Sequence, residues 1–412
     1  MKKTVYMISS MFFPSIGGVE NHIYFISKNL VKKGFDVKII HPVLGEKSNI
    51  EILDGIEIHN IGVGNEKDKK KYHNLKLKSN GGKLSFIYGY LRKYMYNNFA
   101  EDIYKYIEVD IEKNNIKNFI FHQHDFISSM KLSKKISKKY KIIFINHTGE
   151  YLFLRKIPFN KIIIKFLTKQ FSYIIAPSDE LASFNDIRHP NTFKFIPNGV
   201  DLDVFKEKDK WEIDKIKIKY NIDKDKISVL CPRRWAPTKG VIYLIKAIAL
   251  LKKAEMKNVS FIFVGNDYND YPEYKKEIDD IINFENLHSY INLLGNVKAD
   301  EMADLINCSD IVVLPSIMEA VSLSALEAMA CNKIIIATDV GGFPQIINDG
   351  ENGFMIPHSN EKELSSKLMY IINNISDFEF IGKNAGVFAR NNYSWDSIAD
   401  ETIKIYNNYT NN

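Results

Sequence analysis

The segment from Asp310 to Gly342, DIVVLPSIMEAVSLSALEAMACNKIIIATDVGG, contains two glutamates, Glu319 and Glu327, with seven residues between them. This spacing covers just over two helical turns, so both carboxylates would lie near one face of a helix that begins at Glu319. A carboxylate repels a phosphate, but it accepts hydrogen bonds from sugar or ribose hydroxyls. The alternative is an acidic helix start that stabilises the helix dipole, and the spacing alone favours this second interpretation.

Three cations are grouped in the sequence PRRWAPTKG. Arg233, Arg234 and Lys239 lie between an expected strand, Ile227–Cys231, and an expected helix that begins near Gly240. The free N–H groups of a helix start favour an anion, and guanidinium and ammonium groups strengthen that attraction. The pattern is typical of a diphosphate cradle, although a solvated basic loop has the same composition.

Histidines follow two other apolar segments. His147 comes directly after the expected strand Lys141–Asn146, and ligands of open α/β sheets bind at such strand ends, where a histidine can act in acid–base chemistry. A lone histidine is nevertheless more often structural. His122 and His124 lie at the end of the expected strand Asn118–His122. We expect their side chains to project to opposite sides, which argues against a metal site.

Strands and helices that could hold these residues alternate along the chain. Ile311–Leu314 and Ile334–Ala337 are apolar, β-branched runs typical of strands buried on both faces, and Ser322–Ala330 between them has helical periodicity. Together they predict one βαβ unit of a parallel sheet. The chain opens in the same way, with a strand at Lys3–Ser9 and a helix at Val19–Lys33.

The loop before that first helix contains Gly17 and Gly18 in the sequence PSIGGVE. This sequence is not G-x-G-x-x-G, so the fingerprint of a dinucleotide-binding loop is missing. Two glycines before a helix start would let a ligand approach the backbone closely. An ordinary tight turn is an equally good interpretation.

The composition is that of a two-domain globular protein, with 412 residues and 45% apolar content. Residues 1–196 carry 32 Lys and Arg against 18 Asp and Glu, whereas the remainder carries 24 against 32. A basic first half predicts attraction to phosphate groups of a substrate, a nucleic acid or a lipid surface. The three cysteines lack metal-ligand spacing, and neither a membrane-spanning run nor a signal-peptide pattern is evident, so we expect a cytoplasmic protein.

The segment Asn160–Phe171, NKIIIKFLTKQF, combines apolar side chains with Lys161, Lys165 and Lys169 at every fourth position. Basic amphipathic helices of this kind bind membrane surfaces. A core-facing helix with a solvated lysine stripe is the more frequent case, so the membrane interpretation stays a hypothesis.

Two hydrophilic segments are expected to lack regular structure. Asn65–Gly82 is rich in Lys, Asn and Gly, which predicts a mobile surface loop. The charged residues between Asp201 and Lys226 predict a linker between domains. The Asp-x-Asp pairs of this linker, which begin at Asp201 and Asp223, are therefore not expected to bind a metal.

In order and spacing, these motifs resemble those of retaining GT-B glycosyltransferases of family four. The motifs that carry the resemblance are, in chain order, GGVE, PNGVD, the loop with Arg234 and Lys239, the E-x7-E pair Glu319 and Glu327, and SWD near the end. We call the loop with Arg234 and Lys239 the Arg-Lys loop. The resemblance implies an α/β protein with two Rossmann-like domains that face a cleft. The implied parts are an acceptor domain at 1–196, a nucleotide-sugar donor domain at 197–393, and a C-terminal helix at 394–412 that packs on the N-terminal domain.

The resemblance also implies roles for individual residues. The first glutamate would hold the donor sugar, the second the ribose, and the Arg-Lys loop the diphosphate, with Arg233 as the alternative to Arg234. The histidine after the strand would lie near the reacting sugar. Many family members have Gly-Phe-Gly after the first glutamate, where this chain has Ala-Val-Ser. The implied catalytic residues are His147, Arg234, Lys239 and Glu319, and the implied donor-binding residues are Gly17, Gly18, Arg233, Val297, Ala320, Val321, Ser322 and Glu327.

The implied activity is the retaining transfer of a sugar from a nucleoside-diphosphate sugar to a glycan or lipid-linked acceptor, as in polysaccharide synthesis. Because cations would neutralise the leaving diphosphate, we expect no metal and no cofactor. The expected partners are the donor, the acceptor and an anionic membrane surface bound peripherally from the cytoplasm, and not nucleic acid. Two alternatives are a GT-B-shaped epimerase, which would act on the donor without an acceptor, and a catalytically degenerate partner subunit that binds a nucleotide-sugar.

Overall fold

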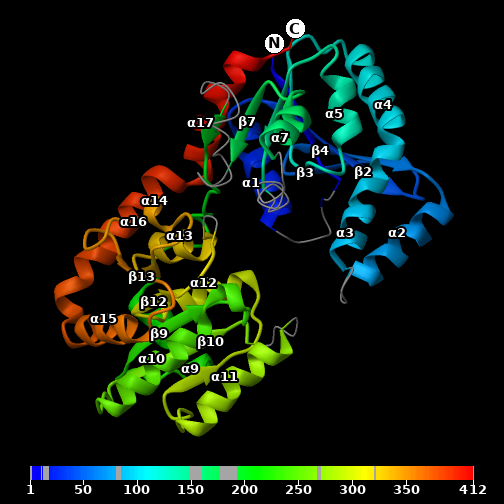
Figure 1. Cartoon of the computed structure of the whole chain (residues 1–412). Coiled ribbons are helices and arrows are strands. Elements are labelled where there is room, and N and C mark those ends of the chain that lie inside the picture. The colour runs from blue at the N-terminus through cyan, green and yellow to red at the C-terminus, as the bar shows by residue number, and fades with distance from the viewer. Residues whose placement is uncertain are drawn as a thin grey trace. The chain divides into compact units, whose positions relative to one another are not determined.

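The computed structural model of the chain describes residues 2–10, 12, 18–79, 85–147, 160–176, 193–266, 271–319 and 322–411. It contains two compact units, which we call the first unit (Met1–Pro197 with Ile398–Asn412) and the second unit (Asn198–Ser397). Each unit has a mainly parallel sheet with helices packed on it (Figure 1). The predicted pair of α/β domains is therefore confirmed.

The first unit has an eight-stranded sheet in the order β3-β4-β2-β1-β5-β6-β7-β8, in which β3 is antiparallel to β4 and the other neighbours are parallel. The chain adds strands first on one side of β1 and then on the other, so the order reverses between β1 and β5. Open α/β sheets bind ligands at the carboxyl ends of strands at such a reversal. The strands are β1 (Thr4–Ile8), β2 (Asp36–Leu44), β3 (Asn49–Leu53), β4 (Ile56–Val63), β5 (Phe119–Gln123), β6 (Ile142–Ile145), β7 (Tyr173–Ala176) and β8 (Phe193–Phe195).

The helices of the first unit bury one apolar face each. In α1, Ile23, Ile26 and Leu30 recur at helical spacing and are fully buried where the helix packs on β2 and β4. The helices described in this unit are α1 (Gly18–Lys32), α2 (Glu66–Ser79), α3 (Ser85–Tyr94), the 3-10 helix η1 (Met95–Phe99), α4 (Ala100–Lys113), α5 (Met130–Ile136) and α7 (Asn160–Thr168).

The predicted loop at Asn65–Gly82 is wrong, because Glu66–Ser79 forms helix α2. The Asn65 side chain accepts hydrogen bonds from the backbone N–H groups of Lys67 (2.9 Å) and Asp68 (3.4 Å), and the Asp68 carboxylate accepts one from the Asn65 N–H (3.0 Å). Acidic residues in the first turn and lysines in the last complement the helix dipole. The helix buries no residue, so the sequence carries no apolar stripe that would indicate it.

The second unit has a six-stranded parallel sheet in the order β11-β10-β9-β12-β13-β14. Its order reverses between β9 and β12, which pair directly. The loops that follow these two strands carry the predicted Arg-Lys and glutamate residues, so the sheet brings the two motifs to one edge. The strands are β9 (Ile227–Pro232), β10 (Val259–Val264), β11 (Ile291–Leu293), β12 (Ile311–Leu314), β13 (Ile334–Thr338) and β14 (Phe354–Ile356).

Helices cover both the sheet and its edges in the second unit (Figure 1). None of the helices in the described part of the whole chain is both long enough and apolar enough to span a bilayer. The helices of this unit are α9 (Lys210–Lys219), η3 (Pro237–Lys239), α10 (Val241–Lys253), α11 (Pro272–Phe284), α12 (Ala299–Asn307), α13 (Leu323–Ala330), α14 (Phe343–Ile346), α15 (Glu361–Asn373), η4 (Ile375–Phe378) and α16 (Glu379–Tyr393).

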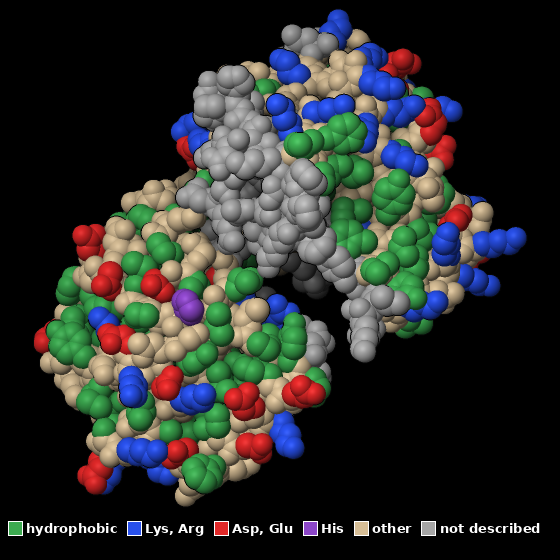
Figure 2. Space-filling view, in the orientation of Figure 1, with side chains coloured by type: hydrophobic (Ala, Val, Ile, Leu, Met, Phe, Trp, Pro, Cys, Tyr) green, Lys and Arg blue, Asp and Glu red, His purple; other side chains and the backbone are tan. Residues whose placement is uncertain are grey.

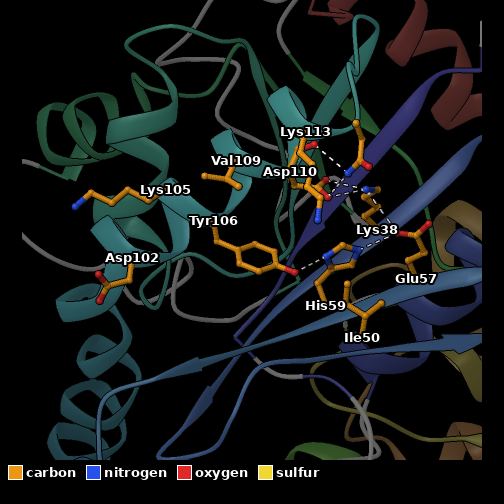
Figure 3. A pocket seen from close by; sticks show the side chains of 11 residues that line it. Lys38, Ile50, Glu57, His59, Asp102, Lys105, Tyr106, Val109, Asp110 and Lys113 are labelled. Carbon is orange, nitrogen blue, oxygen red and sulfur yellow. Dashed lines mark hydrogen bonds and ion pairs between the residues drawn. The ribbon is translucent and has the colours of Figure 1, made fainter.

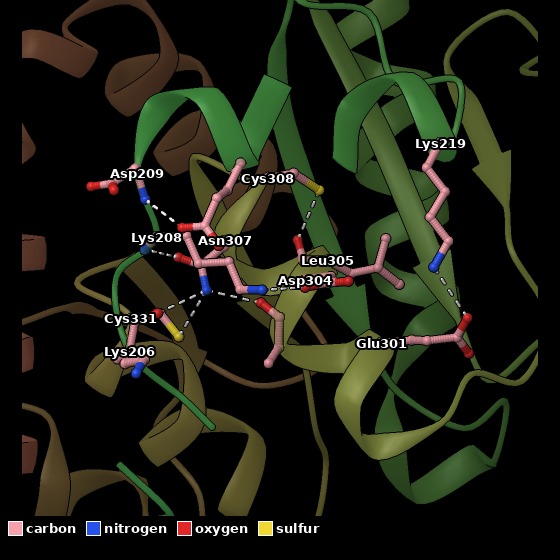
Figure 4. Close-up of polar contacts among 12 residues, drawn as sticks. Lys206, Lys208, Asp209, Lys219, Glu301, Asp304, Leu305, Asn307, Cys308 and Cys331 are labelled. Carbon is pink, nitrogen blue, oxygen red and sulfur yellow. Dashed lines mark hydrogen bonds and ion pairs between the residues drawn. The ribbon is translucent and has the colours of Figure 1, made fainter. Parts of the chain in front are cut away.

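The predicted linker that ends at Lys226 is instead part of the second unit and contains helix α9. Asn307 at the end of α12 anchors it, because its side chain accepts a hydrogen bond from the Lys208 N–H (3.0 Å) and donates one to the Lys206 carbonyl (3.0 Å) (Figure 4). Lys208 also forms an ion pair with Asp304 (2.6 Å). These local contacts explain why a highly charged segment folds onto the domain rather than staying extended.

The last helix, α17 (Trp395–Tyr409), begins in the second unit and continues into the first, as predicted. Ser394 caps it by accepting a hydrogen bond from the Ser397 N–H at 3.1 Å. In the first unit, the Tyr406 hydroxyl lies 2.7 Å from Nδ1 of His122. Asn411 forms backbone hydrogen bonds in both directions with Phe119 (2.8 and 3.0 Å). The chain end is thus an integral part of the first unit.

Candidate active site

A cluster of two cations and one carboxylate lies at the strand reversal of the second sheet. Nζ of Lys239 lies 3.0 Å from each carboxylate oxygen of Glu319, and a terminal guanidinium nitrogen of Arg233 lies 3.1 Å from one of them. The same guanidinium nitrogen donates a hydrogen bond to Oγ of Ser322 at 2.7 Å. Oγ of Ser316 completes the contacts of the Glu319 carboxylate at 3.2 Å.

These side chains come from loops that the sheet places together. Arg233 directly follows β9, and Lys239 ends the short helix η3 in the same loop. Glu319 and Ser322 follow the neighbouring strand β12. The predicted helix at Ser322–Ala330 is confirmed as α13 (Leu323–Ala330) with Ser322 as its N-cap residue, so Glu319 lies in the loop before the helix.

Three glycines let the loops approach each other closely. A Cβ atom at Gly240 would lie 1.9 Å from the Pro315 carbonyl oxygen, and one at Gly341 would lie 1.7 Å from the carbonyl oxygen of Glu319. At Gly265 the corresponding distance to the Arg233 carbonyl oxygen is 2.9 Å. All three have positive φ values, of 63°, 57° and 89° respectively, which favour glycine. Glycine is therefore required around the cluster both for space and for backbone conformation.

The cluster holds its carboxylate in the ionised form. Burial alone would raise the pKa of Glu319, but the charges of Arg233 and Lys239 outweigh burial and lower the pKa below its usual value. Burial lowers the pKa of Lys239, and the charge of Arg233 adds to that effect. Two cations thus share one carboxylate and leave a net positive charge at this edge of the sheet, which suits a diphosphate.

The structure distinguishes the two neighbouring arginines. The Arg233 side chain is buried against Glu319, whereas Arg234 is exposed. Nε of Arg233 is buried and has no hydrogen-bond partner among the described residues. Burying a guanidinium nitrogen without a hydrogen-bond acceptor costs free energy, and such groups are rare. A bound anion would supply the acceptor.

Glu327 lies on α13 and is largely buried. Burial raises its pKa to about 7, against an opposing effect of the Arg233 charge. Val297 lies in the loop after β11, and Ser322 is buried as the N-cap residue of α13. Gly18 is the first residue of α1. The predicted donor-binding residues Gly17, Ala320 and Val321 lie outside the described residues.

In the first unit, His147 follows β6 as predicted, and it is part of a histidine cluster that the sequence did not indicate. Its Nε2 lies 3.2 Å from Nδ1 of His124, and its ring centroid lies 4.5 Å from that of His22 on α1. The expectation that His122 and His124 project to opposite sides is wrong. Residues two apart on a strand share a face, and these two ring centroids are 4.4 Å apart.

His22 is the residue that sequence reasoning missed in this cluster. It lies on α1 between the buried positions of an amphipathic helix, and it is itself 2% exposed. A polar residue on the buried face of a helix was the available signal, since the GGVE motif is followed directly by Asn21 and His22.

A cavity of about 610 Å³ lies in another part of the first unit, beside α4 and strands β2 to β4 (Figure 3). Its buried polar groups pair with one another, since the His59 ring forms hydrogen bonds with the hydroxyl of Tyr106 and the carboxylate of Glu57 (2.9 Å each). Lys38 likewise binds both carboxylate oxygens of Asp110 at 2.9 and 2.8 Å. This pairing favours a structural role for the buried polar residues of the cavity.

Comparison with known families gives matches over both units. Residues 16–204 match the sequence model described as Glycosyltransferase Family 4, and residues 212–386 match the one described as Glycosyl transferases group 1. An uncharacterized glycosyltransferase of Methanocaldococcus jannaschii is 26% identical over 405 residues, which are 97% of each chain.

Two further proteins resemble the chain. The lipopolysaccharide 1,2-N-acetylglucosaminetransferase of Salmonella typhimurium is 27% identical over 301 residues, which are 69% of this chain and 73% of the relative. A protein of Anabaena, solved in complex with UDP and glucose, has a TM-score of 0.69 at 17% identity over 98% of this chain and 99% of that one. Together with the two sheets, the structural likeness confirms the predicted GT-B fold.

Proposed function

The chain belongs to the family-four GT-B glycosyltransferases, and from this premise we propose that it transfers a sugar, with retention of configuration, from a nucleoside-diphosphate sugar to a glycan or lipid-linked acceptor. The observation that carries the proposal is the cluster of Arg233, Lys239 and Glu319 at the strand reversal of the second sheet. A net positive site beside a carboxylate combines attraction for a diphosphate with an acceptor for sugar hydroxyls.

The donor would be held through complementary groups of the second unit. Arg233 and Lys239 bind the diphosphate, and the partnerless Nε of Arg233 gains an acceptor. Glu319 accepts hydrogen bonds from the sugar hydroxyls, and Glu327 on α13 binds the ribose. The exposed Arg234 would meet the diphosphate from the solvent side.

Catalysis would follow from the same charges. The bond from the anomeric carbon to the diphosphate oxygen breaks, the diphosphate leaves with the bonding electron pair, and the acceptor oxygen forms the new bond as its proton passes to the departing diphosphate. Arg233 and Lys239 stabilise the charge that develops on the leaving oxygen, which is an effect on the order of 10²–10³ in rate for one preorganised donor. His147 would act on the acceptor side of the reaction. Proton NMR of the product decides whether the anomeric configuration is retained.

These two cations perform the neutralisation that a divalent ion performs in other transferases, so we expect full activity without a metal. Activity should be unchanged in EDTA and on addition of Mg²⁺ after chelation. Complete loss of transfer in EDTA, with recovery on Mg²⁺, would contradict this part of the proposal.

Among the relatives, the Salmonella enzyme transfers N-acetylglucosamine in lipopolysaccharide synthesis, and the Anabaena protein binds UDP. We therefore propose a UDP-sugar as the donor and a glycolipid as the acceptor. Incubation with radiolabelled UDP-, GDP- and ADP-sugars and a lipid extract should place label in the lipid fraction for one UDP-sugar. Conversion of the donor sugar without acceptor would identify an epimerase. Nucleotide binding without either reaction would identify a catalytically inactive partner subunit.

A lysine-rich face of the first unit supports an acceptor at an anionic membrane surface. On α7, Ile162 is 69% and Phe166 is 54% exposed, and Lys165 and Lys169 beside them are exposed as well. Nζ of Lys169 lies 4.6 Å from the centroid of the Phe166 ring, and Nζ of Lys134 on α5 lies 5.3 Å from it. Apolar side chains framed by lysines are the pattern of helices that bind anionic lipid surfaces.

The face continues along α5 to a second apolar stripe. Lys131, one turn before Lys134, lies with its Nζ 5.8 Å from the centroid of the Tyr94 ring at the end of α3. Ile87, Leu91 and Tyr94 follow one another on α3 at helical spacing and are exposed by 51%, 49% and 42%. Figure 2 shows Lys and Arg side chains surrounding apolar ones on the visible face of this unit.

Vesicle sedimentation tests this surface. The chain should sediment with phosphatidylglycerol-containing vesicles, but not with pure phosphatidylcholine, and binding should weaken with salt. Phe166→Ser should reduce binding, whereas Phe284→Ser, a control at a residue of α11 that is 88% exposed, should not. Equal sedimentation with both vesicle types would contradict binding to an anionic membrane surface.

A further inference from the structure

Three histidines of the first unit bring one ring nitrogen each to a common point. His22 on α1, His124 after β5 and His147 after β6 have ring nitrogens that all lie within 4.8 Å of one another. They come from three elements around the reversal between β1 and β5, so the sheet itself fixes their positions. The Arg233–Lys239–Glu319 cluster, by contrast, belongs to the second unit.

The distance between two of these nitrogens fits metal coordination. Nδ1 of His124 and Nε2 of His147 are 3.2 Å apart. Two nitrogens bound to one tetrahedral Zn²⁺ at about 2.0–2.1 Å are separated by about 3.3 Å. The pair is thus spaced like two ligands of one ion. The third histidine has a ring nitrogen within 4.8 Å of the other two, so a side-chain rotation could bring it to the same spacing.

The tautomer of His124 also favours coordination. Its Nε2 lies 3.2 Å from Sδ of Met7 on β1, which is an acceptor, so Nε2 carries the proton. Nδ1 then presents its lone pair towards His147. Proteins orient metal-binding imidazoles in this way: a hydrogen bond to one ring nitrogen holds the ring, and the other nitrogen faces the ion.

The three histidines lie largely in the interior of the first unit. His22 and His124 are 2% and 1% exposed, and His147 is half-buried. The contact between His124 and His147 joins one pair of ring nitrogens, whereas an ion would bind one nitrogen of each of the three histidines.

We propose that His22, His124 and His147 bind one divalent transition-metal ion, with Zn²⁺ as the reference ion and water as the fourth ligand. Three neutral nitrogen ligands select ions of the zinc, nickel and copper class over Mg²⁺ or Ca²⁺, which prefer oxygen. Occupancy withdraws His147 from the transferase reaction, so the ion inhibits sugar transfer. The proposed inhibition of sugar transfer rests on the proposed function, whereas the proposed metal-binding site does not.

Cobalt absorption spectroscopy tests the site on the full chain without an affinity tag. Co²⁺ added to the EDTA-treated, desalted protein should give the visible bands of tetrahedral cobalt, saturate at one ion per chain, and be displaced by Zn²⁺. His22→Gln and His124→Gln should each weaken binding at least tenfold. His59→Gln, a buried histidine in the cavity beside α4, should leave it unchanged. A wild-type chain without these bands, or bands that persist in His22→Gln, would overturn the site.

A measurement on the wild-type chain avoids dependence on variants that fail to fold. X-ray absorption at the zinc edge should show three imidazole nitrogens at about 2.0 Å, and a coordination shell dominated by oxygen would overturn the proposal. Zn²⁺ at saturation should abolish sugar transfer, and EDTA should restore it. Full activity of the zinc-loaded chain would refute the link to His147. Because cobalt binding needs no substrate, failure of the proposed transferase activity would not be mistaken for failure of the site.

Discussion

Nζ of Lys239 lies 3.0 Å from both carboxylate oxygens of Glu319, and this ion pair joins the loop after β9 to the loop after β12. The two residues are far apart in the sequence, and the reversal of strand order brings them together. The pair is largely buried, with side chains 18% and 9% exposed, and Arg233 adds a second cation. A buried cluster with an excess of cations is better suited to binding an anion than to stabilising the fold.

Replacing Glu319 by Gln should reduce sugar transfer by about 10²-fold or more. The amide keeps the shape of the side chain but removes its negative charge. That charge strengthens the hydrogen bonds accepted from sugar hydroxyls and balances the positive charge of Lys239. Transfer kinetics with a labelled donor measure the effect, and circular dichroism checks the fold. Glu285→Gln removes the partner of Lys253 in a more exposed ion pair of the same unit and should have little effect. Equal activity of both variants would show that Glu319 is not part of the site.

The two arginines should differ in their contribution to nucleotide binding. Arg233→Ala should raise the dissociation constant for the nucleoside diphosphate by about 10- to 100-fold, because it removes a buried, charge-assisted donor. Arg234→Ala should raise it by about threefold or less, because an exposed cation contributes little. Isothermal titration calorimetry on both variants measures the two dissociation constants. A larger increase for Arg234→Ala than for Arg233→Ala would restore Arg234 as the diphosphate-binding arginine that the family pattern suggested.

Gly341→Ala should disrupt the donor site through the backbone. A Cβ atom at this position would lie 1.7 Å from the Glu319 carbonyl oxygen, so the loop that carries Glu319 must move. Gly350→Ala is the matched control, since Gly350 has a φ of 76° but no atom within 4 Å of the added Cβ. Both variants should lose about 1–2 kcal/mol from the left-handed conformation. A loss of nucleotide affinity is expected for Gly341→Ala alone, and unchanged affinity there would contradict the close packing.

Much of this arrangement could be predicted from the sequence. Apolar runs such as Ile311–Leu314 indicate buried strands because parallel strands are covered on both sides. Polar residues that follow such runs are expected at the edge formed by the carboxyl ends of the strands, and Lys239 and Glu319 lie there. The choice between Arg233 and Arg234 could not be made in this way, since neighbours in one loop differ only in their three-dimensional surroundings.

Other features depend on contacts that no local pattern records. Helix α2 has no apolar stripe, and its caps at Asn65 are visible only once the helix is present. His22 meets His124 and His147 because three separate elements converge at the strand reversal. The error over His122 and His124 was one of strand geometry, since alternate residues share a face.

Glu327 should make stability depend on pH. Its pKa is raised from 4.5 to about 7 by burial, so the folded state holds its proton more tightly than the unfolded state. The resulting stability is complete below about pH 4.5 and is lost as the pH rises through about 7, a change of up to about 3 kcal/mol.

Glu327→Gln mimics the protonated form, so its stability advantage over the wild type should grow between pH 4.5 and 7 and then level off. Urea unfolding at several pH values measures this difference. Glu363→Gln, at an exposed position on α15, is the control and should run parallel to the wild type. A difference for Glu327→Gln that does not change with pH would show that the carboxyl is not perturbed.

The most direct test of the account is the thermal unfolding of the full chain with UDP, GDP, ADP and their sugars, compared between the wild type and Lys239→Ala. A ligand that binds the native state raises the unfolding midpoint by mass action. The account predicts that UDP and one UDP-sugar raise the midpoint of the wild type by several degrees and leave that of Lys239→Ala unchanged. An equal shift in both proteins, or no shift with any nucleotide, would contradict the assignment of Arg233, Lys239 and Glu319 as the donor site.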